Sequence, residues 1–335
     1  MTVGIKDVAR VAGVSPATVS RVLGNGPVSD DLRQKVEAAI KATQYRPNLA
    51  ARRLRSQHSR TIGLIVSDIR NPFFTTLSRA VEDAAYGADM RVVLCNTDEN
   101  PAREAMYLRM MQEERITGLI YAPTRTTAER LGRMEFSFPV VLVDRMGPAG
   151  AHDAVTIDNA SAAGVLVDHL VGQGHRRILG LFGNTSSTAE LRHDGYAAAM
   201  ARHGLDTDVR FLPPTAEAAE AELTRRLAAG ARPDAVMVSN GLLLLGLYRA
   251  ARRAGLESPR DIAIAGFDNE TWTELVGPGL TVIEQPVAEI GRAAMDLVFE
   301  RLRTPDMARR QVVLAARLVV RGSSAARERT ARPAI

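Results

Sequence analysis

Residues 16–23 predict a short helix whose two faces differ in chemistry. Its apolar face is formed by residues at helical spacing, Val19, Val22 and Leu23. The opposite face carries an arginine among small side chains, namely Pro16, Ala17, Ser20 and Arg21. An arginine offers a planar set of N–H donors, and a helix of this kind fits the major groove of double-stranded DNA. The chemistry that these residues suggest is therefore contact with DNA.

A preceding helix and a tight turn would hold this face outward. The first helix is predicted from an apolar stripe, Ile5, Val8, Ala9 and Ala12, and Gly13 predicts the turn. Ser15 is a good N-cap, and Pro16 suits the first helical position because its missing N–H would be unpaired there. A third helix is predicted after Ser29, where Asp30 and Asp31 lie at the positive end of the helix dipole. Its buried stripe would be Leu32, Val36, Ala39 and Ile40, with Tyr45 closing a small core.

Positive charge is concentrated in the same part of the chain. Residues 1–60 contain 11 Lys and Arg and 4 Asp and Glu, which gives a net charge of +7. The whole chain carries only +5, so residues 61–335 sum to −2. The charge by itself could belong to a solvated basic surface. Because the charge coincides with the helix-turn-helix pattern, the sequence favours binding to DNA phosphates.

Composition argues against several other classes of protein. The 335 residues allow two or three domains, and the single Cys95 excludes a disulfide framework. The six histidines show no metal-ligand spacing, and no glycine fingerprint or Gly-x-Ser-x-Gly motif indicates an enzyme. We find neither a signal peptide nor an apolar stretch long enough to span a membrane. We therefore expect a cytoplasmic regulator with no metal, no cofactor and no membrane partner.

After a headpiece at residues 1–46, a basic linker is predicted at residues 47–60. Arg46-Pro47 ends the third helix, and Asn48 can cap a short segment that ends at Arg55. This segment is too short to be a stable isolated helix. It is either a disordered basic linker or a helix that folds only on DNA, with Leu54 as an apolar wedge in the minor groove.

Residues 61–323 alternate between strand and helix patterns. The strand-like runs are 62–66, 92–95, 118–121 and 140–143, followed by a second series at 154–157, 178–182, 235–238 and 262–265. This alternation predicts an α/β domain of two lobes with doubly wound parallel sheets, in which ligands bind beyond the carboxyl ends of the strands. A helix at about 287–303 and a strand at about 311–320 would recross between the lobes. Residues 324–335 are expected to form a disordered basic tail.

The ordered motifs resemble the lactose-repressor/galactose-repressor (LacI–GalR) family of bacterial transcription regulators. They run from Ile5 to about Gly322 and read IKDVARVAGVSPATVSRVL, VSDDLRQKVEAAI, YRPNLAARRL, TIGLIVSDIRNPFF, GHRRI, AIAGFDN and LTVIEQPVAEIG. The resemblance implies a homodimer that binds a pseudo-palindromic DNA operator and responds to a small-molecule effector.

The resemblance also assigns roles to residues of the headpiece and linker. Base edges would face Pro16, Ala17 and Arg21, and Arg21 could donate two hydrogen bonds to a guanine. Phosphate contacts would come from Lys6, Thr18, Ser20, Asn25 and Ser29. In the linker, Leu54 matches the leucine with which family members open the central base step. The DNA-binding residues expected around it are Asn48, Ala51 and Arg55.

The two lobes resemble periplasmic sugar-binding proteins, and most closely their ribose-binding branch. The resemblance implies a site made of residues after strands or at helix starts: Asn71, Phe73, Phe74, Asp144, Arg145, Ser186, Thr188, Arg192, Asn240, Asp268 and Gln285. Phe73 and Phe74 could sandwich the apolar face of a sugar, and the polar side chains could bind its hydroxyls. Two departures from the family pattern affect the identity of the sugar. Gly241 stands where an acidic residue is usual. An aromatic residue is usual in the region of 211–215, and Phe211 could be displaced from that role.

Alternative interpretations of these residues remain open at this point. Asp144 and Arg145 could form a structural ion pair, the two phenylalanines could belong to a core, and Asp268 could cap the following turn. The ligand could also strengthen DNA binding, as a purine, a phosphorylated metabolite or a protein co-effector would. A purine would need more stacking surface and fewer partners for hydroxyl groups than these residues offer, which argues against a purine.

Overall fold

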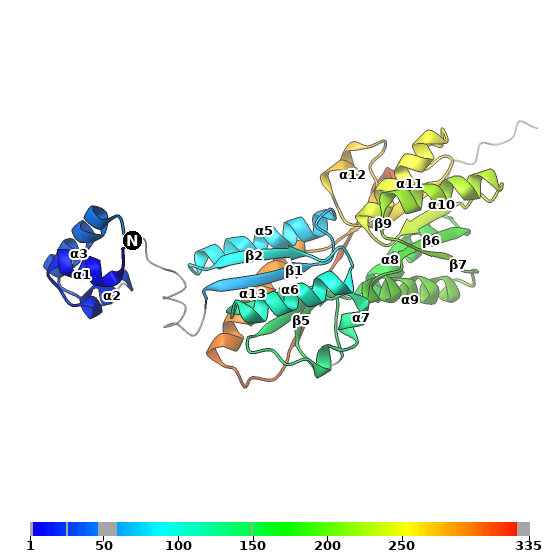
Figure 1. Cartoon of the computed structure of the whole chain (residues 1–335). Coiled ribbons are helices and arrows are strands. Elements are labelled where there is room, and N and C mark those ends of the chain that lie inside the picture. The colour runs from blue at the N-terminus through cyan, green and yellow to red at the C-terminus, as the bar shows by residue number, and fades with distance from the viewer. Residues whose placement is uncertain (1–2, 25, 46–58, 149, 327–335) are drawn as a thin grey trace, which may run out of the picture. The chain divides into compact units, whose positions relative to one another are not determined.

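The computed structural model describes residues 3–24, 26–45, 59–148 and 150–326. Contacts divide the chain into two compact units, Met1–Ser59 and Arg60–Ile335 (Figure 1). Among the described residues, no helix has the length and apolar character needed to cross a membrane. Five predicted DNA-binding residues lie outside the described residues, namely Asn25, Asn48, Ala51, Leu54 and Arg55.

The described residues of the first unit form the helices α1 (Ile5–Ala12), α2 (Pro16–Leu23) and α3 (Asp30–Thr43). Gly13 ends α1 in the left-handed conformation with a φ of 63°, which glycine adopts without strain. The Ser15 hydroxyl accepts a hydrogen bond from the Thr18 N–H at 3.1 Å, as expected of an N-cap. Ser29 precedes α3 but its side chain makes no capping bond. The small core is the predicted one, with Val8, Ala9, Val19, Val22, Val36 and Ala39 buried.

The second unit consists of two lobes, each built on a six-stranded sheet. The strands of the first lobe are β1 (Thr61–Val66), β2 (Arg91–Asn96), β3 (Gly118–Tyr121), β4 (Val140–Val143), β5 (Asp153–Ile157) and β11 (Gln311–Leu314). Their spatial order is β11-β5-β4-β3-β1-β2, and all pairs are parallel. The helical elements of this lobe are α5 (Pro72–Gly87), α6 (Pro101–Glu113), α7 (Arg125–Ala128), η1 (Leu131–Arg133) and α13 (Val287–Arg303).

The second lobe has the strand order β12-β10-β9-β8-β6-β7. Its strands are β6 (Ile178–Gly183), β7 (Asp208–Leu212), β8 (Ala235–Val238), β9 (Ala263–Phe267), β10 (Thr281–Glu284) and β12 (Arg317–Val319). Only the β10–β12 pair is antiparallel among the pairs described for this sheet. Its helical elements are α8 (Asn159–Gly172), α9 (Ser187–Arg202), α10 (Ala216–Ala228), α11 (Gly241–Arg253), α12 (Thr271–Leu275) and η2 (Gly322–Ser324).

Strand β1 illustrates why helices cover both faces of these sheets. Ile62, Leu64 and Val66 point to one face and join the core formed with α5 and α13, whereas Ile65 joins a separate core with α6. Every residue of β1 is buried, and all of them except Thr61 are apolar. This is the pattern expected of a parallel strand buried on two sides. The predicted fold class, a helical headpiece followed by two doubly wound lobes, is confirmed.

Four details differ from the sequence-based expectation. Strand β5 belongs to the first sheet instead of opening the second series, and β7 was not predicted. The single strand expected at 311–320 is two strands, because the chain leaves one sheet at Leu314 and enters the other at Arg317. The tail does not begin at Ser324, which is buried and whose hydroxyl lies 2.8 Å from His169 Nε2.

The connections after β5, β10 and β11 are the three crossings between the lobes. Close helix packing lies next to the first crossing. A Cβ atom placed on Gly195 of α9 would lie 2.0 Å from the carbonyl oxygen of Ala160, the second residue of α8. The pair α10 and α11 repeats this arrangement, because a Cβ on Gly246 would lie 1.9 Å from the carbonyl oxygen of Ala216. Each pair of helices can therefore approach this closely only because glycine has no side chain at the point of contact.

We predict that Gly195→Ala lowers the free energy of unfolding by roughly 1–3 kcal/mol, because the added methyl group must push two helix backbones apart. Gly172→Ala is the matched control, because Gly172 ends α8 with open space around it. It should be neutral or stabilising, since alanine favours helix by up to about 1 kcal/mol. Chemical denaturation followed by circular dichroism measures both variants. Equal stabilities would contradict the close approach of α8 and α9.

Candidate DNA-binding helix and ligand cleft

Helix α2 exposes most of the residues predicted to face DNA. Pro16, Ala17 and Arg21 are exposed, whereas Val19 and Val22 are buried against the other helices. Of the residues predicted to bind phosphates, Lys6 and Ser29 are exposed, and Thr18 and Ser20 are half-buried. The Thr18 hydroxyl lies 3.0 Å from the Ser15 hydroxyl, which holds it near the start of α2. The geometry therefore presents one face of α2 to solvent, as the sequence pattern predicts.

In the second unit, the structure brings all the predicted ligand-binding residues together. One cavity of about 60 Å³ between the lobes is lined by every member of the set: Asn71, Phe73, Phe74, Asp144, Arg145, Ser186, Thr188, Arg192, Asn240, Asp268 and Gln285. All except Arg192 follow a strand or lie at the start of a helix, at the edge where parallel strands end. The expectation that Arg192 opens a helix is wrong, because α9 begins at Ser187 and Arg192 lies in its second turn. The cavity also contains residues that sequence reasoning missed, among them Ser67, Glu99, Pro214, Ser239 and Leu242.

Contacts across this cleft hold the two lobes together. The Thr188 hydroxyl of α9 donates a hydrogen bond to the backbone carbonyl of Asp144 at 3.1 Å. Nearby, Arg125 of α7 pairs with Glu190 of α9 at 2.7 Å. The cavity between these contacts is far smaller than the roughly 300–1,000 Å³ typical of ligand pockets. A ligand of ordinary size can therefore enter only when the lobes separate.

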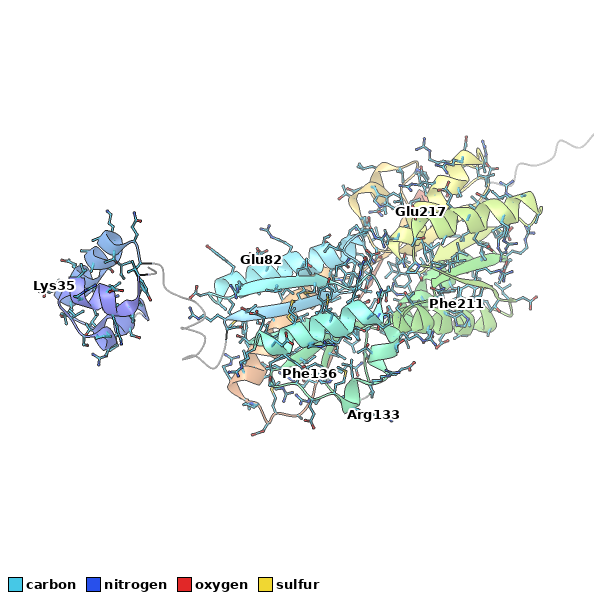
Figure 2. All side chains as sticks on the ribbon, viewed as in Figure 1. Lys35, Glu82, Arg133, Phe136, Phe211 and Glu217 are labelled. Carbon is cyan, nitrogen blue, oxygen red and sulfur yellow. The ribbon has the colours of Figure 1, made fainter. Side chains whose placement is uncertain are left out.

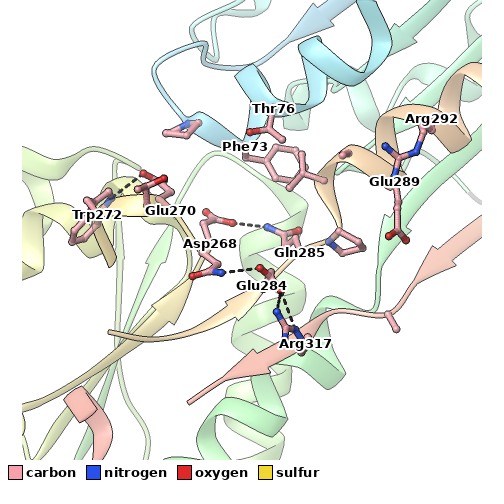
Figure 3. Close-up of a pocket in the computed structure, with 17 residues that line it drawn as sticks. Phe73, Thr76, Asp268, Glu270, Trp272, Glu284, Gln285, Glu289, Arg292 and Arg317 are labelled. Atoms are coloured by element: carbon pink, nitrogen blue, oxygen red, sulfur yellow. Dashed lines mark hydrogen bonds and ion pairs between the residues drawn. The ribbon is translucent and has the colours of Figure 1, made fainter. Parts of the chain in front are cut away.

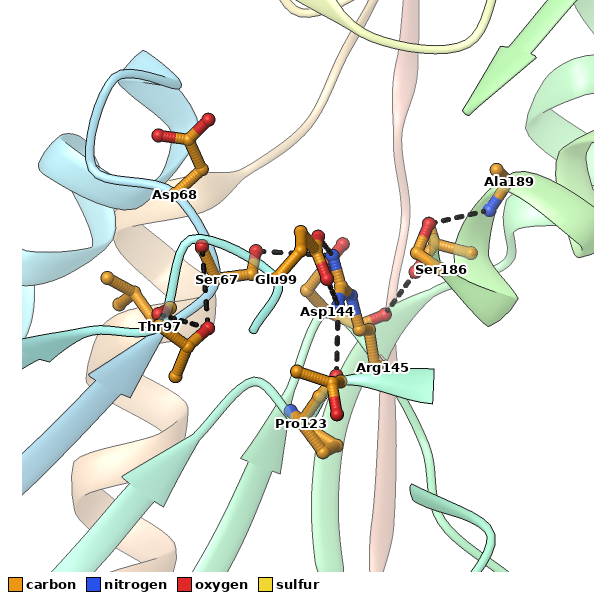
Figure 4. Close-up of polar contacts among 12 residues, drawn as sticks. Ser67, Asp68, Thr97, Glu99, Pro123, Asp144, Arg145, Ser186 and Ala189 are labelled. Carbon is orange, nitrogen blue, oxygen red and sulfur yellow. Dashed lines mark hydrogen bonds and ion pairs between the residues drawn. The ribbon is translucent and has the colours of Figure 1, made fainter. Parts of the chain in front are cut away.

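Arg145 is held by a partner that the sequence did not identify. Its Nη1 donates to Glu99 Oε2 at 2.8 Å and to the Pro123 carbonyl at 2.9 Å (Figure 4). Its Nη2 bonds Glu99 Oε1 and the Ser67 hydroxyl. The Arg145 Nε lies 3.4 Å from Asp144 Oδ2 and makes no hydrogen bond among the described residues. The main ion pair of Arg145 is thus with Glu99, and Asp144 stays available to a ligand.

The two aspartates of the cleft have similar backbones and different surroundings. Asp144 and Asp268 both have positive φ angles, 63° and 78°, which non-glycine residues rarely adopt. Asp268 accepts hydrogen bonds from the Gly241 N–H at 2.8 Å and from the Gln285 amide at 2.7 Å. Asp268 therefore binds the first N–H of α11, whose N-cap is Asn240, and Glu270 precedes α12. Burial raises the pKa of Asp144, and the attraction of Arg145 and Arg192 only partly opposes this effect.

Arg192 is buried and only partly satisfied. Its Nε donates to Asn159 Oδ1 at 2.8 Å and its Nη1 donates to the Ser239 carbonyl at 2.5 Å. The guanidinium carbon lies 3.9 Å from the centroid of the Phe267 ring, which adds a cation–π contact. The Arg192 Nη2 has no hydrogen-bond partner among the described residues. Because Asn159 begins α8 at the first crossing, this amide links the crossing to a guanidinium of the cleft.

The expected aromatic sandwich is wrong. The rings of Phe73 and Phe74 contact each other edge to face, with centroids 5.0 Å apart and an angle of 85° between them. Adjacent rings in that geometry cannot lie on the two sides of one ligand. Both side chains are also part of the core of the first lobe, so they form a single apolar wall of the cleft.

Comparisons with known proteins agree with this architecture. The bacterial regulatory proteins of the lacI family match residues 4–48, and the periplasmic binding protein-like domain matches residues 167–324. The ribose operon repressor of Escherichia coli (strain K12) is 32% identical over 332 residues, covering 96% of this chain and 99% of that protein. This chain belongs to the lacI family. It is a DNA-binding transcription regulator and not an enzyme, and the resemblance inferred from its motifs is confirmed.

Other members of the lacI family are similar over nearly their whole length. The HTH-type transcriptional repressor PurR of Photobacterium profundum is 32% identical, covering 95% of this chain and 98% of that protein. The crystal structure of the lac repressor dimer bound to operator and the anti-inducer ONPF superimposes with a TM-score of 0.87 at 26% identity. It covers 97% of this chain and 100% of that one.

In this lacI-family protein, Glu270 lies against Gly241. A Cβ atom on Gly241 would lie 2.3 Å from Glu270 Oε1, so the Glu270 carboxylate occupies the space that a side chain at position 241 would need. Phe211 does not line the cavity. It is 44% exposed on β7, at the outer side of its lobe, and packs against Phe182 and His193 (Figure 2). Pro214 and Leu242 supply apolar surface on that side of the cleft.

We predict that Asp144→Asn stabilises the protein at neutral pH. A carboxyl group whose pKa is raised by folding favours the folded state below its ordinary pKa of about 3.9, and this benefit is lost as the pH rises through the raised value. The stability gain of the variant over the wild type should therefore shrink as the pH falls. Urea unfolding across a pH series measures it, with Asp206→Asn, at an exposed position, as the control. A variant less stable than the wild type at neutral pH would contradict the sign.

Proposed function

We propose that the protein is a homodimeric repressor released from a pseudo-palindromic operator by a small neutral sugar. Two headpieces would read successive major grooves through α2, and the sugar would bind in the cleft between the lobes. The observation that carries the proposal is the convergence of all predicted polar and apolar cleft residues on one cavity. Such a mixture of carboxylates, guanidinium, amides and an aromatic wall suits a ring with several hydroxyls.

The charge balance of the cleft favours a neutral ligand over a phosphorylated one. Glu99 neutralises Arg145 through two hydrogen bonds. That leaves the carboxylates of Asp144 and Asp268 opposite the guanidinium of Arg192. A phosphate would therefore meet more negative than positive charge at close range, which is unfavourable at low dielectric. Sugar hydroxyls, in contrast, can donate to both carboxylates and accept from Arg192 Nη2.

A purine that strengthens DNA binding is the second candidate, because the PurR relative is as similar to this chain as the ribose operon repressor is. The cleft is less suited to a planar base. Its phenylalanine wall belongs to one lobe, and the opposite lobe contributes Pro214 and Leu242 in place of an aromatic ring. A purine would thus stack on one face only.

The sugar would release the protein from DNA because it binds one arrangement of the lobes more tightly than the other. A sugar that contacts Asp144 in one lobe and Arg192 in the other stabilises the arrangement in which both reach it. It can weaken operator binding only as far as it binds that arrangement more tightly than the DNA-bound one. The contacts Thr188–Asp144 and Arg125–Glu190 would break and re-form as the ligand enters.

A melting-temperature screen tests the effector class. We expect one pentose or hexose to raise the melting temperature, because a ligand at 100 times its dissociation constant adds about 2.7 kcal/mol to the folded state. The corresponding sugar phosphates and purines should not raise it. Asp144→Ala should abolish the shift, and Thr75→Ala, at an exposed position of α5, should keep it. A rise with a purine alone, together with tighter operator binding, would replace the sugar by the second candidate.

Replacement of Arg21 tests the DNA-reading face. Arg21→Ala should weaken binding to the preferred operator by roughly 1–3 kcal/mol and relax selectivity at one base pair, because a bidentate contact to a guanine is lost. Lys6→Ala should instead weaken binding to all sequences alike and reduce the salt dependence. Fluorescence anisotropy with operator variants distinguishes the two effects. Uniform weakening by Arg21→Ala would assign this residue to the phosphates.

A further inference from the structure

A second and larger hollow lies beside the cleft. It has a volume of about 920 Å³ and shares Phe73, Asp268 and Gln285 with the cleft (Figure 3). The hydrogen bond from the Gln285 amide to Asp268 Oδ1 belongs to the walls of both. We call this hollow the crossing groove, because residues 284–286, 315 and 317 of two lobe crossings line it. Its volume falls in the range of roughly 300–1,000 Å³ that small-molecule sites occupy.

Both lobes contribute to the crossing groove. Phe73 and Thr76 belong to α5 of the first lobe, and Arg292 belongs to α13, which packs on α5. On the opposite side, Asn269 and Trp272 belong to the second lobe. A molecule in this groove would therefore contact both lobes and the segments that connect them, so its binding energy would depend on the angle between the lobes.

The aromatic wall of the crossing groove is held in place. The Trp272 indole N–H donates to Glu270 Oε2 at 2.8 Å (Figure 3), and its ring lies 6.1 Å from that of Tyr248. The other oxygen of Glu270 is buried against Gly241 and has no hydrogen-bond partner among the described residues. An alanine at position 241 would collide with this carboxylate. Glycine at position 241 therefore leaves room for the Glu270 carboxylate that positions Trp272.

Carboxyl groups outnumber cations in the lining of the crossing groove, because Asp268, Glu270, Glu284 and Glu289 face only Arg292 and Arg317. Glu284 accepts from Asn269 at 2.7 Å and from Arg317 at 2.9 Å. Asp268 is satisfied by Gly241 and Gln285. Glu289 and Arg292 lie three residues apart on α13. The excess of carboxyl groups disfavours an anion. The carboxyl, hydroxyl and amide groups of the lining can bind the hydroxyl groups of a neutral ring.

We propose that the crossing groove is a second binding site, which takes a neutral ring compound rich in hydroxyl groups. The indole of Trp272 contacts the apolar face of the ring, and Thr76, Asn269 and Gln285 bind its hydroxyls. The proposal holds whichever class of ligand the cleft binds. Because Asp268 and Gln285 belong to both sites, each ligand changes the affinity of the other by the same factor.

Trp272 provides a direct test, because it is the only tryptophan of the chain. The full-length protein is titrated with D-ribose, D-glucose, D-galactose and cellobiose up to high millimolar concentration, with tryptophan fluorescence as the readout. We expect at least one of these sugars to change the emission saturably. The change should persist in Asp144→Ala, which removes a carboxylate of the cleft alone.

Two neighbouring substitutions on α5 provide the matched pair. Thr76 lines the crossing groove, whereas Thr75 is equally exposed and does not. Thr76→Phe should raise the dissociation constant measured by fluorescence at least about tenfold, equivalent to about 1.4 kcal/mol, because the ring fills the groove. Thr75→Phe should leave the dissociation constant within about twofold, equivalent to about 0.4 kcal/mol. Circular dichroism verifies that each variant is folded.

Three results would overturn the proposal. The first is no saturable change with any of the four sugars. The second is a change that disappears in Asp144→Ala and survives in Thr76→Phe, since Trp272 would then report on the cleft. The third is a lower sedimentation coefficient for Thr76→Phe but not for Thr75→Phe, which would show that a second copy of the chain covers the groove. The melting-temperature screen with Asp144→Ala tests the cleft separately, so either site can fail without the other.

Discussion

The constraint on which the ligand cleft depends is that parallel strands end at the same edge of a sheet. Each lobe directs the carboxyl ends of β1, β4, β6, β8 and β9 towards the space between the lobes. The residues that follow these strands are no longer paired with a neighbouring strand, so their side chains and N–H groups can bind a ligand. Asp144 and Asp268 occupy equivalent places in the two lobes, and both need an unusual backbone conformation to turn a carboxylate inward. Such strain persists only where the surrounding structure enforces it.

The same constraint explains how much of the site the sequence could reveal. Every residue chosen because it follows a strand or opens a helix lines the cavity, since position in a parallel sheet determines direction. Glu99 escaped notice because it lies in a turn after an edge strand, with a φ of 57°, and only the fold brings it to Arg145. The aromatic sandwich failed for a local reason. Consecutive residues at a helix start point in different directions, so Phe73 and Phe74 could not face each other across a ligand.

Topology was harder to predict than the elements themselves. The run at residues 311–320 has one continuous strand pattern, yet the chain changes sheets within it. No local preference distinguishes such a crossing from an uninterrupted strand. Ser324 shows the opposite error. Small residues next to a basic tail suggested disorder, but Ser323 and Ser324 are buried in hydrogen bonds with Thr281, Ile264 and the histidines of α8 and its following loop. Tertiary contacts decide the structure of such a segment.

Incompletely paired charge gives the cleft a cost in stability. Arg192 has one nitrogen without a hydrogen-bond partner among the described residues, and burial raises the pKa of Asp144 despite the attraction of Arg145 and Arg192. In a well-packed core, an apolar residue would serve stability better than either. Such groups are expected on a surface shaped for a ligand, because a free N–H group or an unused lone pair can still bind a hydroxyl.

The glycines that join α8 to α9 and α10 to α11 have a mechanical consequence. At each of these contacts the two helix backbones cannot move nearer to each other without an atomic collision. Helices α8 and α9 pack in one core of the second lobe, and α10 and α11 pack in the other, so both cores contain such a contact. A rotation of one lobe against the other would then move the second lobe as one body, and the three short crossings would be the segments that change conformation.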